Sequence, residues 1–288
     1  DFMESGTPGV KSTRDGWLNR HLSSRKDPSE TAFRAVAMTT NLPRTLRGQA
    51  PALALSRLND FELKTGGQNS AVKATFESMY EQSVDSVLGG TGSDAFEAIR
   101  FLKKANPAQY LPASGVQYPR SPFGNSLKQV AQMIKANVGL EVAFVESNGW
   151  DHHVAEGGVQ GQLAVRLNDL AQGLSAFYED LQNRMDDIVV LTMSEFGRTA
   201  RENGNRGTDH GHATSLFVLG GPVRGGRIYG QWPGLQPDQL FEGRDLALTT
   251  DFRNVFGEVI LKHLGNPNLN TVFPNFGMKP DQFRNLLA

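Results

Sequence analysis

The sequence predicts an α/β protein with a mostly parallel central sheet. Short apolar runs rich in β-branched residues alternate with longer segments whose apolar residues recur at helical spacing. Such alternation implies parallel strands joined by right-handed crossovers. The chain has 288 residues, enough for one large α/β domain. No repeat, low-complexity tract or clear linker interrupts it, so we expect residues 1–288 to form a single domain.

The first third of the chain is the least regular. Residues 1–30 are rich in Gly, Ser, Pro and charge, and we expect irregular structure with a short helix near Leu18–Leu22. Residues 33–38 (FRAVAM) predict a strand. Apolar residues at helical spacing predict helices over residues 72–87 and 96–102, which end at glycine and proline signals.

Repeating α/β units begin near Gly124. We expect helices over residues 127–138 and 163–181, and strands over residues 140–145, 188–192 and 215–219. We also expect a short strand at Arg227–Tyr229 and a helix that follows a Thr250 N-cap. A short tail helix is expected at the end of the sequence.

Composition excludes several classes of function. Lys and Arg number 29 against 30 Asp and Glu, so a formal charge of -1 provides no general field for nucleic acid or an anionic membrane. No apolar run is long enough for a membrane-spanning helix. The chain has no cysteine, which excludes disulfides, thiolate metal ligands and a cysteine nucleophile.

Metal-ligand side chains follow the strand predicted at residues 188–192. Glu195, Asp209, His210 and His212 lie in a Gly-rich, charged loop before the next apolar strand. Ligands of open α/β sheets bind at the carboxyl ends of strands, and carboxylates with imidazoles suit a divalent metal such as zinc or manganese. The alternative is a solvated loop that holds two histidines by chance.

The strand at residues 140–145 leads into a second such loop. Asp151 and His153 are two positions apart, so one turn can aim both inward while His152 points elsewhere. Four of the six histidines fall in the two loops, and the pair of loops predicts a shared metal site. The other two, His21 and His263, have the character of surface or capping residues.

Arg198 is the candidate anion clamp, because it follows the 188–192 strand closely and its guanidinium can bind phosphate or sulfate oxygens in pairs.

Several strings in this chain resemble a known family. These are ESGTPG, GWDHH, SEFGRT, GTDHG, FVLGGPVRGGRIYGQWP and TTDFR, in that order. They resemble the bacterial family labelled domain of unknown function 1501, which is similar to the alkaline phosphatase and sulfatase superfamily. The resemblance implies an alkaline-phosphatase-like three-layer sandwich. It aligns Asp151 and His153 with the first ligand pair, Ser194-Glu195 with the second acidic pair, and His210 or His212 with the last histidine ligand.

The resemblance also implies parts that we do not find in the sequence. In the superfamily the first strand supplies a metal-binding carboxylate and the next helix supplies a hydroxyl or thiol nucleophile. Both would precede Asp1, because ESGTPG resembles the segment after that helix. Family members often carry a twin-arginine export signal, which implies a periplasmic or extracellular location.

We therefore expect a metal-dependent hydrolase-like protein that acts on small phosphate or sulfate esters. Zinc or manganese is favoured over calcium or magnesium, because imidazoles join the oxygen ligands. Arg198 would steady the ester oxygens, and His212 or His210 would act as acid or base. The alternatives are an exported metal-binding protein without turnover and a phosphomutase-like transferase. The oligomeric state stays open.

Overall fold

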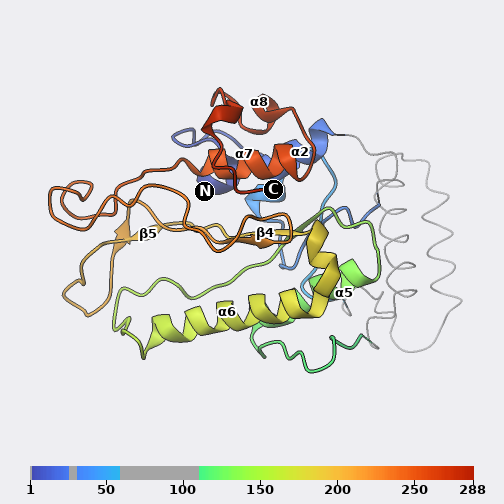
Figure 1. Ribbon diagram of the computed structural model, residues 1–288, viewed down its shortest axis with the longest axis horizontal. Helices are drawn as coiled ribbons and strands as arrows, with labels where there is room; N and C mark the ends of the chain where they lie inside the picture. The colour runs from blue at the N-terminus through green and yellow to red at the C-terminus, as the bar shows by residue number, and fades with distance from the viewer. Residues whose placement is uncertain (1, 26–30, 59–109) are drawn as a thin grey trace, which may run out of the picture.

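The computed structural model describes residues 2–25, 31–58 and 110–288 (Figure 1). The helices expected over residues 72–87 and 96–102 lie outside these residues. The described helices are α1 (Phe2–Ser5), α2 (Trp17–Ser24), α5 (Pro122–Lys135), α6 (Gln162–Leu181), α7 (Phe252–Lys262) and α8 (Leu269–Val272), with 3-10 turns η1 (Arg44–Leu46), η4 (Gln182–Asp187) and η5 (Pro280–Gln282). The strands are β1 (Ala35–Ala37), β2 (Leu53–Ala54), β3 (Val142–Phe144), β4 (Val189–Leu191), β5 (Gly197–Arg198), β6 (His210–Gly211) and β7 (Val218–Gly220).

Helix starts follow local capping chemistry. The Ser121 hydroxyl accepts a hydrogen bond from the Gly124 N–H, and proline occupies the first turn of α5. The cap of α7 is Asp251, whose carboxylate accepts the Arg253 N–H at 2.9 Å. The predicted cap, Thr250, lies one residue too early. The sequence between β7 and α7 contains no strand at Arg227–Tyr229, so that prediction is wrong.

The α/β class is confirmed, but the strands pair differently from the prediction. β1 pairs in parallel with β2 and β3, in the order β2-β1-β3. β4 pairs antiparallel with β7, and β5 pairs antiparallel with β6. The chain turns back within the long loop after β4 and returns alongside that strand. Within the described residues the strand layer is therefore mixed rather than mostly parallel.

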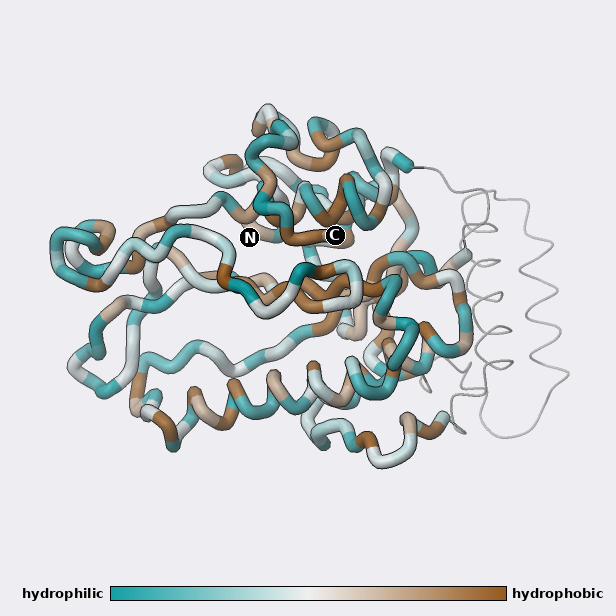
Figure 2. The backbone as a smooth tube through the Cα atoms, in the orientation of Figure 1, coloured by the Kyte–Doolittle hydropathy of each residue, from teal (hydrophilic) through white to brown (hydrophobic). Residues whose placement is uncertain are grey.

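Helices cover both faces of the strands. Alternate residues of β1 show it: Ala35 and Ala37 belong to a core with α2, α7 and α8, whereas Val36 belongs to a core with α5 and α6. β4 divides in the same way, with Val189 packed on the first core and Val190 on the second. Figure 1 shows the two helical layers on either side of β4, and Figure 2 shows the hydrophobic colouring of the strands between them.

Helix α6 packs mainly through its C-terminal half. Phe177 is 3% exposed and lies in the core with α5, and Leu170 is partly buried against it. Leu167, one turn earlier on the same stripe, is 45% exposed. Asp180 on this helix is buried and accepts hydrogen bonds from Lys135 and from the hydroxyl of Tyr118. This carboxylate therefore ties α6 to α5 and to the segment before it.

A second buried polar group joins α2 to β3 and the chain after α7. His21 is fully buried, so its prediction as a surface or capping residue is wrong, whereas His263 does cap α7. The His21 Nε2 lies 3.0 Å from Glu141, and its Nδ1 accepts from the Asn266 amide at 2.9 Å. Arg34 donates to the other Glu141 oxygen at 2.6 Å. Burial of Glu141 is thus compensated by two hydrogen-bond donors.

None of the helices among the described residues is long and apolar enough to cross a membrane.

Candidate metal site

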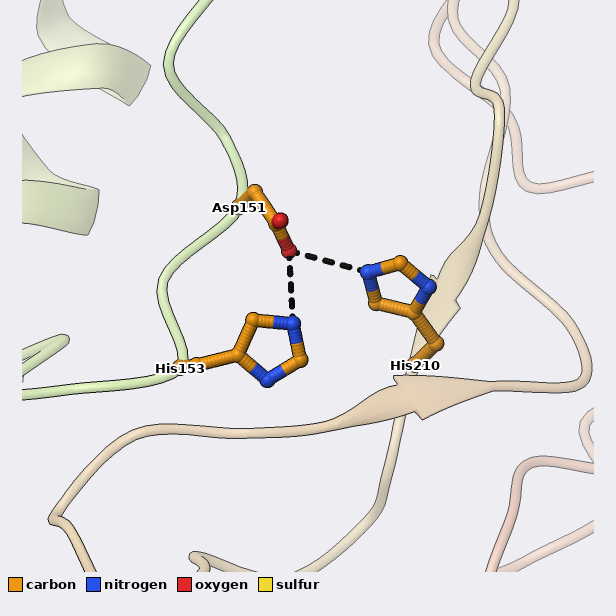
Figure 3. Close-up of side chains that lie close together, drawn as sticks. All are labelled: Asp151, His153 and His210. Atoms are coloured by element: carbon orange, nitrogen blue, oxygen red, sulfur yellow. Dashed lines mark hydrogen bonds and ion pairs between the residues drawn. The ribbon is translucent and has the colours of Figure 1, made fainter.

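The two predicted loops meet in space. The loop after β3 carries Asp151 and His153, and the β5–β6 ladder brings in His210 from a distant part of the chain (Figure 3). One ligand-capable atom from each of the three side chains lies within 4.8 Å of the others. The convergence that the sequence predicts is therefore present for these residues, and they could hold a metal ion.

One carboxylate oxygen is the meeting point. Oδ1 of Asp151 lies 3.0 Å from Nε2 of His153 and 2.9 Å from Nε2 of His210. The three side chains are 42% to 56% exposed, so an ion can reach them from solvent. The spacing of Asp151 and His153 produces this geometry, since the intervening His152 points inward and is only 5% exposed.

Both imidazole rings are held by other groups. Nδ1 of His153 lies 2.9 Å from Oδ1 of Asp209, so a proton on Nδ1 leaves Nε2 free to bind a metal. The ring of His210 stacks on Phe196 with centroids 4.1 Å apart and an interplanar angle of 8°. Two oriented imidazoles and one carboxylate form a donor set of the kind that zinc takes in catalytic sites. The residues present therefore fit a divalent metal.

Arg198 is tied into the protein rather than extended toward solvent. It lies opposite His210 in the β5–β6 ladder. Its guanidinium donates to Oδ1 of Asp151 at 2.7 Å, to the Trp150 carbonyl at 2.6 Å and to the Thr208 carbonyl at 2.6 Å. The guanidinium carbon also lies 4.7 Å from the ring centre of Phe196. In this arrangement Arg198 binds the two loops together.

The pKa values of two carboxyl groups at the site, Asp151 and Asp209, are lowered by their neighbours. The hydrogen bond from His210 lowers the pKa of Asp151 below its ordinary value, more strongly than its slight burial raises it, and Arg198 adds to the lowering. The pKa of Asp209 is lowered in turn by the hydrogen bonds from His153 and Asn203. Both carboxylates are therefore ionised at neutral pH, as ligation and orientation of imidazoles require.

Backbone hydrogen bonds fasten the two loops along a seam. The N–H groups of Thr208, Ala155 and Glu156 donate to carbonyls of the opposite loop at 2.9 to 3.0 Å. Gly207 lies at the closest approach, where a Cβ atom would come within 2.3 Å of the His153 backbone. Only glycine leaves this space, so Gly207 serves the contact between the loops.

Three further predicted site residues lie outside the triad. Glu195 is exposed on a bend before β5, and its side chain makes no hydrogen bond or ion pair with any described residue. The bend turns the chain before β5 starts, which leaves this carboxylate in solvent. His212 is exposed, and its ring stacks on Phe241 with centroids 4.0 Å apart. Asp209, predicted as a ligand, instead contacts the far nitrogen of His153.

Sequence reasoning missed two residues that shape the site. Asn203 donates to Asp209 at 3.0 Å and to the His153 carbonyl at 3.0 Å, and its own carbonyl accepts the N–H groups of Asn205 and Gly207. Phe196 supports the His210 ring. The only sequence signal for Asn203 is its position in an Asn- and Gly-rich turn, where such side chains often bind nearby backbone.

Comparison with known proteins gives a family. The family model described as "Protein of unknown function (DUF1501)" matches residues 2–266. Comparisons with curated proteins and with solved structures give no match.

Proposed function

The chain belongs to the DUF1501 family of proteins of unknown function, and from this starting point we propose that it is a metal-dependent hydrolase-like protein acting on phosphate or sulfate esters. The observation that carries the proposal is the convergence of Asp151, His153 and His210 at one solvent-accessible point. The proposed fold is the alkaline-phosphatase-like sandwich that the sequence strings resemble. The proposed location is outside the cytoplasm, on the same resemblance.

The proposed cofactor is zinc or manganese, held by the Asp151 carboxylate and the Nε2 atoms of His153 and His210. A divalent ion bound there would polarise an ester oxygen and lower the pKa of a bound water. Asp209 keeps the His153 proton on Nδ1, and Phe196 fixes the plane of the His210 ring. These contacts support the proposal because ligand imidazoles in proteins are usually oriented in this way.

We propose a role for Arg198 that differs from the anion clamp expected from sequence. Among the described residues, its guanidinium contacts the Asp151 carboxylate, two backbone carbonyls and the Phe196 ring. We propose that it positions Asp151 and balances the charge of the carboxylate. An ester oxygen would then meet the guanidinium only at the face that these contacts leave open. His212, exposed near Phe241, keeps its proposed role as acid or base.

The engagement of Arg198 favours a second candidate, a metal-binding protein without turnover. With its hydrogen bonds made to the protein, the guanidinium is a poor clamp for an ester. Ser194 is also occupied, because its hydroxyl donates to the Phe196 carbonyl at 2.7 Å. A binding or assembly component needs only the triad, whereas an esterase also needs a nucleophile, either a side chain or a metal-bound water.

Elemental analysis and ester assays separate the two candidates. Wild type should retain stoichiometric zinc or manganese after gentle purification, and a His153→Ala, His210→Ala double variant should lose it. The matched control His263→Ala, which removes a histidine outside the triad, should keep the metal. Hydrolysis of aryl phosphate or aryl sulfate by the intact protein supports the hydrolase. Metal without turnover supports the binding protein, and metal-free wild type that gains nothing from added zinc contradicts both.

A further inference from the structure

We propose that an open cleft between residues 11–14 and 43–47 binds the phosphate or sulfate group of a small anionic ligand. The cleft has a volume of about 810 Å³, within the usual range for small-molecule sites. Side chains from three parts of the chain line it: Glu4, Lys11, Ser12, Thr13, Arg14, Pro43, Arg44, Arg47 and Glu146. None of the triad residues is among them, so this site is separate from the candidate metal site.

The charge of the cleft differs from that of the whole chain. Four of its lining residues are basic and two are acidic, in a protein whose formal charge is -1. A concave surface with an excess of one sign of charge concentrates ions of the opposite sign. Arginine forks and a lysine ammonium are the side chains that bind phosphate and sulfate oxygens best.

Three of the four cations have unused donors. Lys11 and Arg14 are exposed and form no hydrogen bond or ion pair with any described residue. Among the described residues, the Arg47 side chain has one partner: its Nε donates to the Leu42 carbonyl at 2.8 Å. Like charges around one concavity repel each other, and an anion between them relieves the repulsion. The cleft thus offers several free donors where an anion would gain most.

The backbone beneath these cations is fixed without a ligand. The Gly16 N–H donates to the Arg47 carbonyl at 2.9 Å. A Cβ at Gly16 would lie 2.2 Å from the Arg44 carbonyl oxygen, so the two segments are in direct contact. The Arg44 guanidinium also donates to the Thr13 carbonyl. Segments held in this way lose little conformational freedom when a ligand binds.

The two carboxylates define the kind of anion. Glu146 is exposed on the loop after β3, and Glu4, in α1, has one long contact of 3.5 Å from the Thr45 N–H among the described residues. Both carboxylates line the cleft and repel a long polyanion that would run across it. A compact anion, such as sulfate or a short phosphate, meets the cations without that repulsion. We therefore assign the cleft to small anions rather than to polyanionic polymers.

The test is calorimetric titration with inorganic pyrophosphate and sulfate, at low and at physiological salt. The cleft variant is Lys11→Gln, Arg14→Gln. The matched control is Arg120→Gln, Arg227→Gln, which removes the same charge from exposed positions that have no side-chain partner among the described residues. Wild type and control should bind with the same affinity. The cleft variant should bind at least about tenfold more weakly.

Further measurements keep the inference independent of the metal site and of folding. The His153→Ala, His210→Ala variant should bind pyrophosphate as wild type does, because it leaves the cleft intact. Unfolding midpoints of both charge variants should match wild type, and Arg47→Gln provides a second test at the cleft. Equal losses in the cleft and control variants would overturn the assignment. Wild type that binds dextran sulfate but not pyrophosphate would overturn it in favour of a polymer-binding surface.

Discussion

Arg198 and His210 face each other across the β5–β6 ladder, and both contact the same oxygen of Asp151. A short antiparallel pair therefore fixes a cation and an imidazole on one carboxylate that comes from another loop. The contact distances, 2.7 Å and 2.9 Å, leave little room for either partner to move without moving the other. Arg198 and His210 are thus coupled in position as well as in charge.

Replacement of Asp209 by asparagine should weaken zinc binding. The carboxylate that holds the proton on Nδ1 of His153 is lost, and such partners of ligand histidines typically contribute about 10- to 100-fold in affinity. Competition with a chromophoric chelator measures the change. Asp238→Asn is the matched control, because Asp238 is exposed and away from the triad. Equal affinity of Asp209→Asn and wild type would contradict the orienting role.

Replacement of Arg198 by glutamine should destabilise the protein as well as change the site. Two hydrogen bonds to the opposite loop and one within the loop of Arg198 itself are removed, and bonds to charged groups contribute roughly 1.5–3 kcal/mol each before neighbouring contacts compensate. Urea unfolding should show a lower free energy of unfolding, by about 1–3 kcal/mol. Arg201→Gln, an exposed neighbour, should change it by less than about 0.5 kcal/mol. Equal stability of the two variants would show that the contacts contribute little.

Replacement of Phe177 by alanine should be costly, because its ring is 3% exposed between α5 and α6. Large-to-small changes of buried aromatic residues cost about 3–5 kcal/mol. Leu170→Ala, on the partly buried part of the stripe, should cost about 2 kcal/mol. Leu167→Ala, 45% exposed on the same helix, provides the control and should cost much less. Chemical denaturation of the three variants tests the order, and similar values would mean that α6 packs evenly along its length.

Lowering the pH should reduce the free energy of unfolding, because Glu141 becomes protonated. Burial raises the pKa of this carboxyl, but the hydrogen bonds from His21 and Arg34 outweigh burial. The net result is a pKa of about 2, below the ordinary 4.5. A pKa that is lower in the folded protein gives stability that is present above pH 4.5 and is lost as pH falls toward 2. Glu141→Gln should therefore be less stable than wild type at pH 7, with the gap closing as the pH is lowered through that window.

The control for this pH dependence is Glu202→Gln, an exposed glutamate without a side-chain partner among the described residues. Its free energy of unfolding should follow wild type at every pH. A constant gap between Glu141→Gln and wild type from pH 7 to pH 2 would show that the carboxylate charge is not what stabilises the folded state.

Part of the site was predictable from sequence because it depends on local spacing. Asp151 and His153 alternate with a buried His152, and a two-residue period is visible in the letters alone. The contribution of His210 followed from the rule that loops gather at strand ends. The separation of Glu195 from the triad did not follow, because a bend before β5 decides it. Asp209 has the right chemistry for a ligand, and only coordinates reveal which atom it faces.

The fold shows the same division. The helices α5, α6 and α7 follow from apolar periodicity and capping residues, and the structure has them within a few residues of the prediction. The antiparallel pairing of β4 with β7 was not predictable, since strand direction depends on how a long loop returns rather than on the composition of either strand. His21 was misjudged for a related reason: its burial depends on Glu141 and Asn266, which are distant in sequence.

The hydrogen-bonded seam between the two loops has a kinetic consequence. Because Thr208, Ala155 and Glu156 already join the loops, their relative position is settled during folding and no slow closure has to follow the arrival of an ion. Metal uptake should then be a single step whose observed rate rises in proportion to ion concentration. Release should be equally direct, so an ion bound by the triad would exchange with the surrounding medium rather than stay trapped.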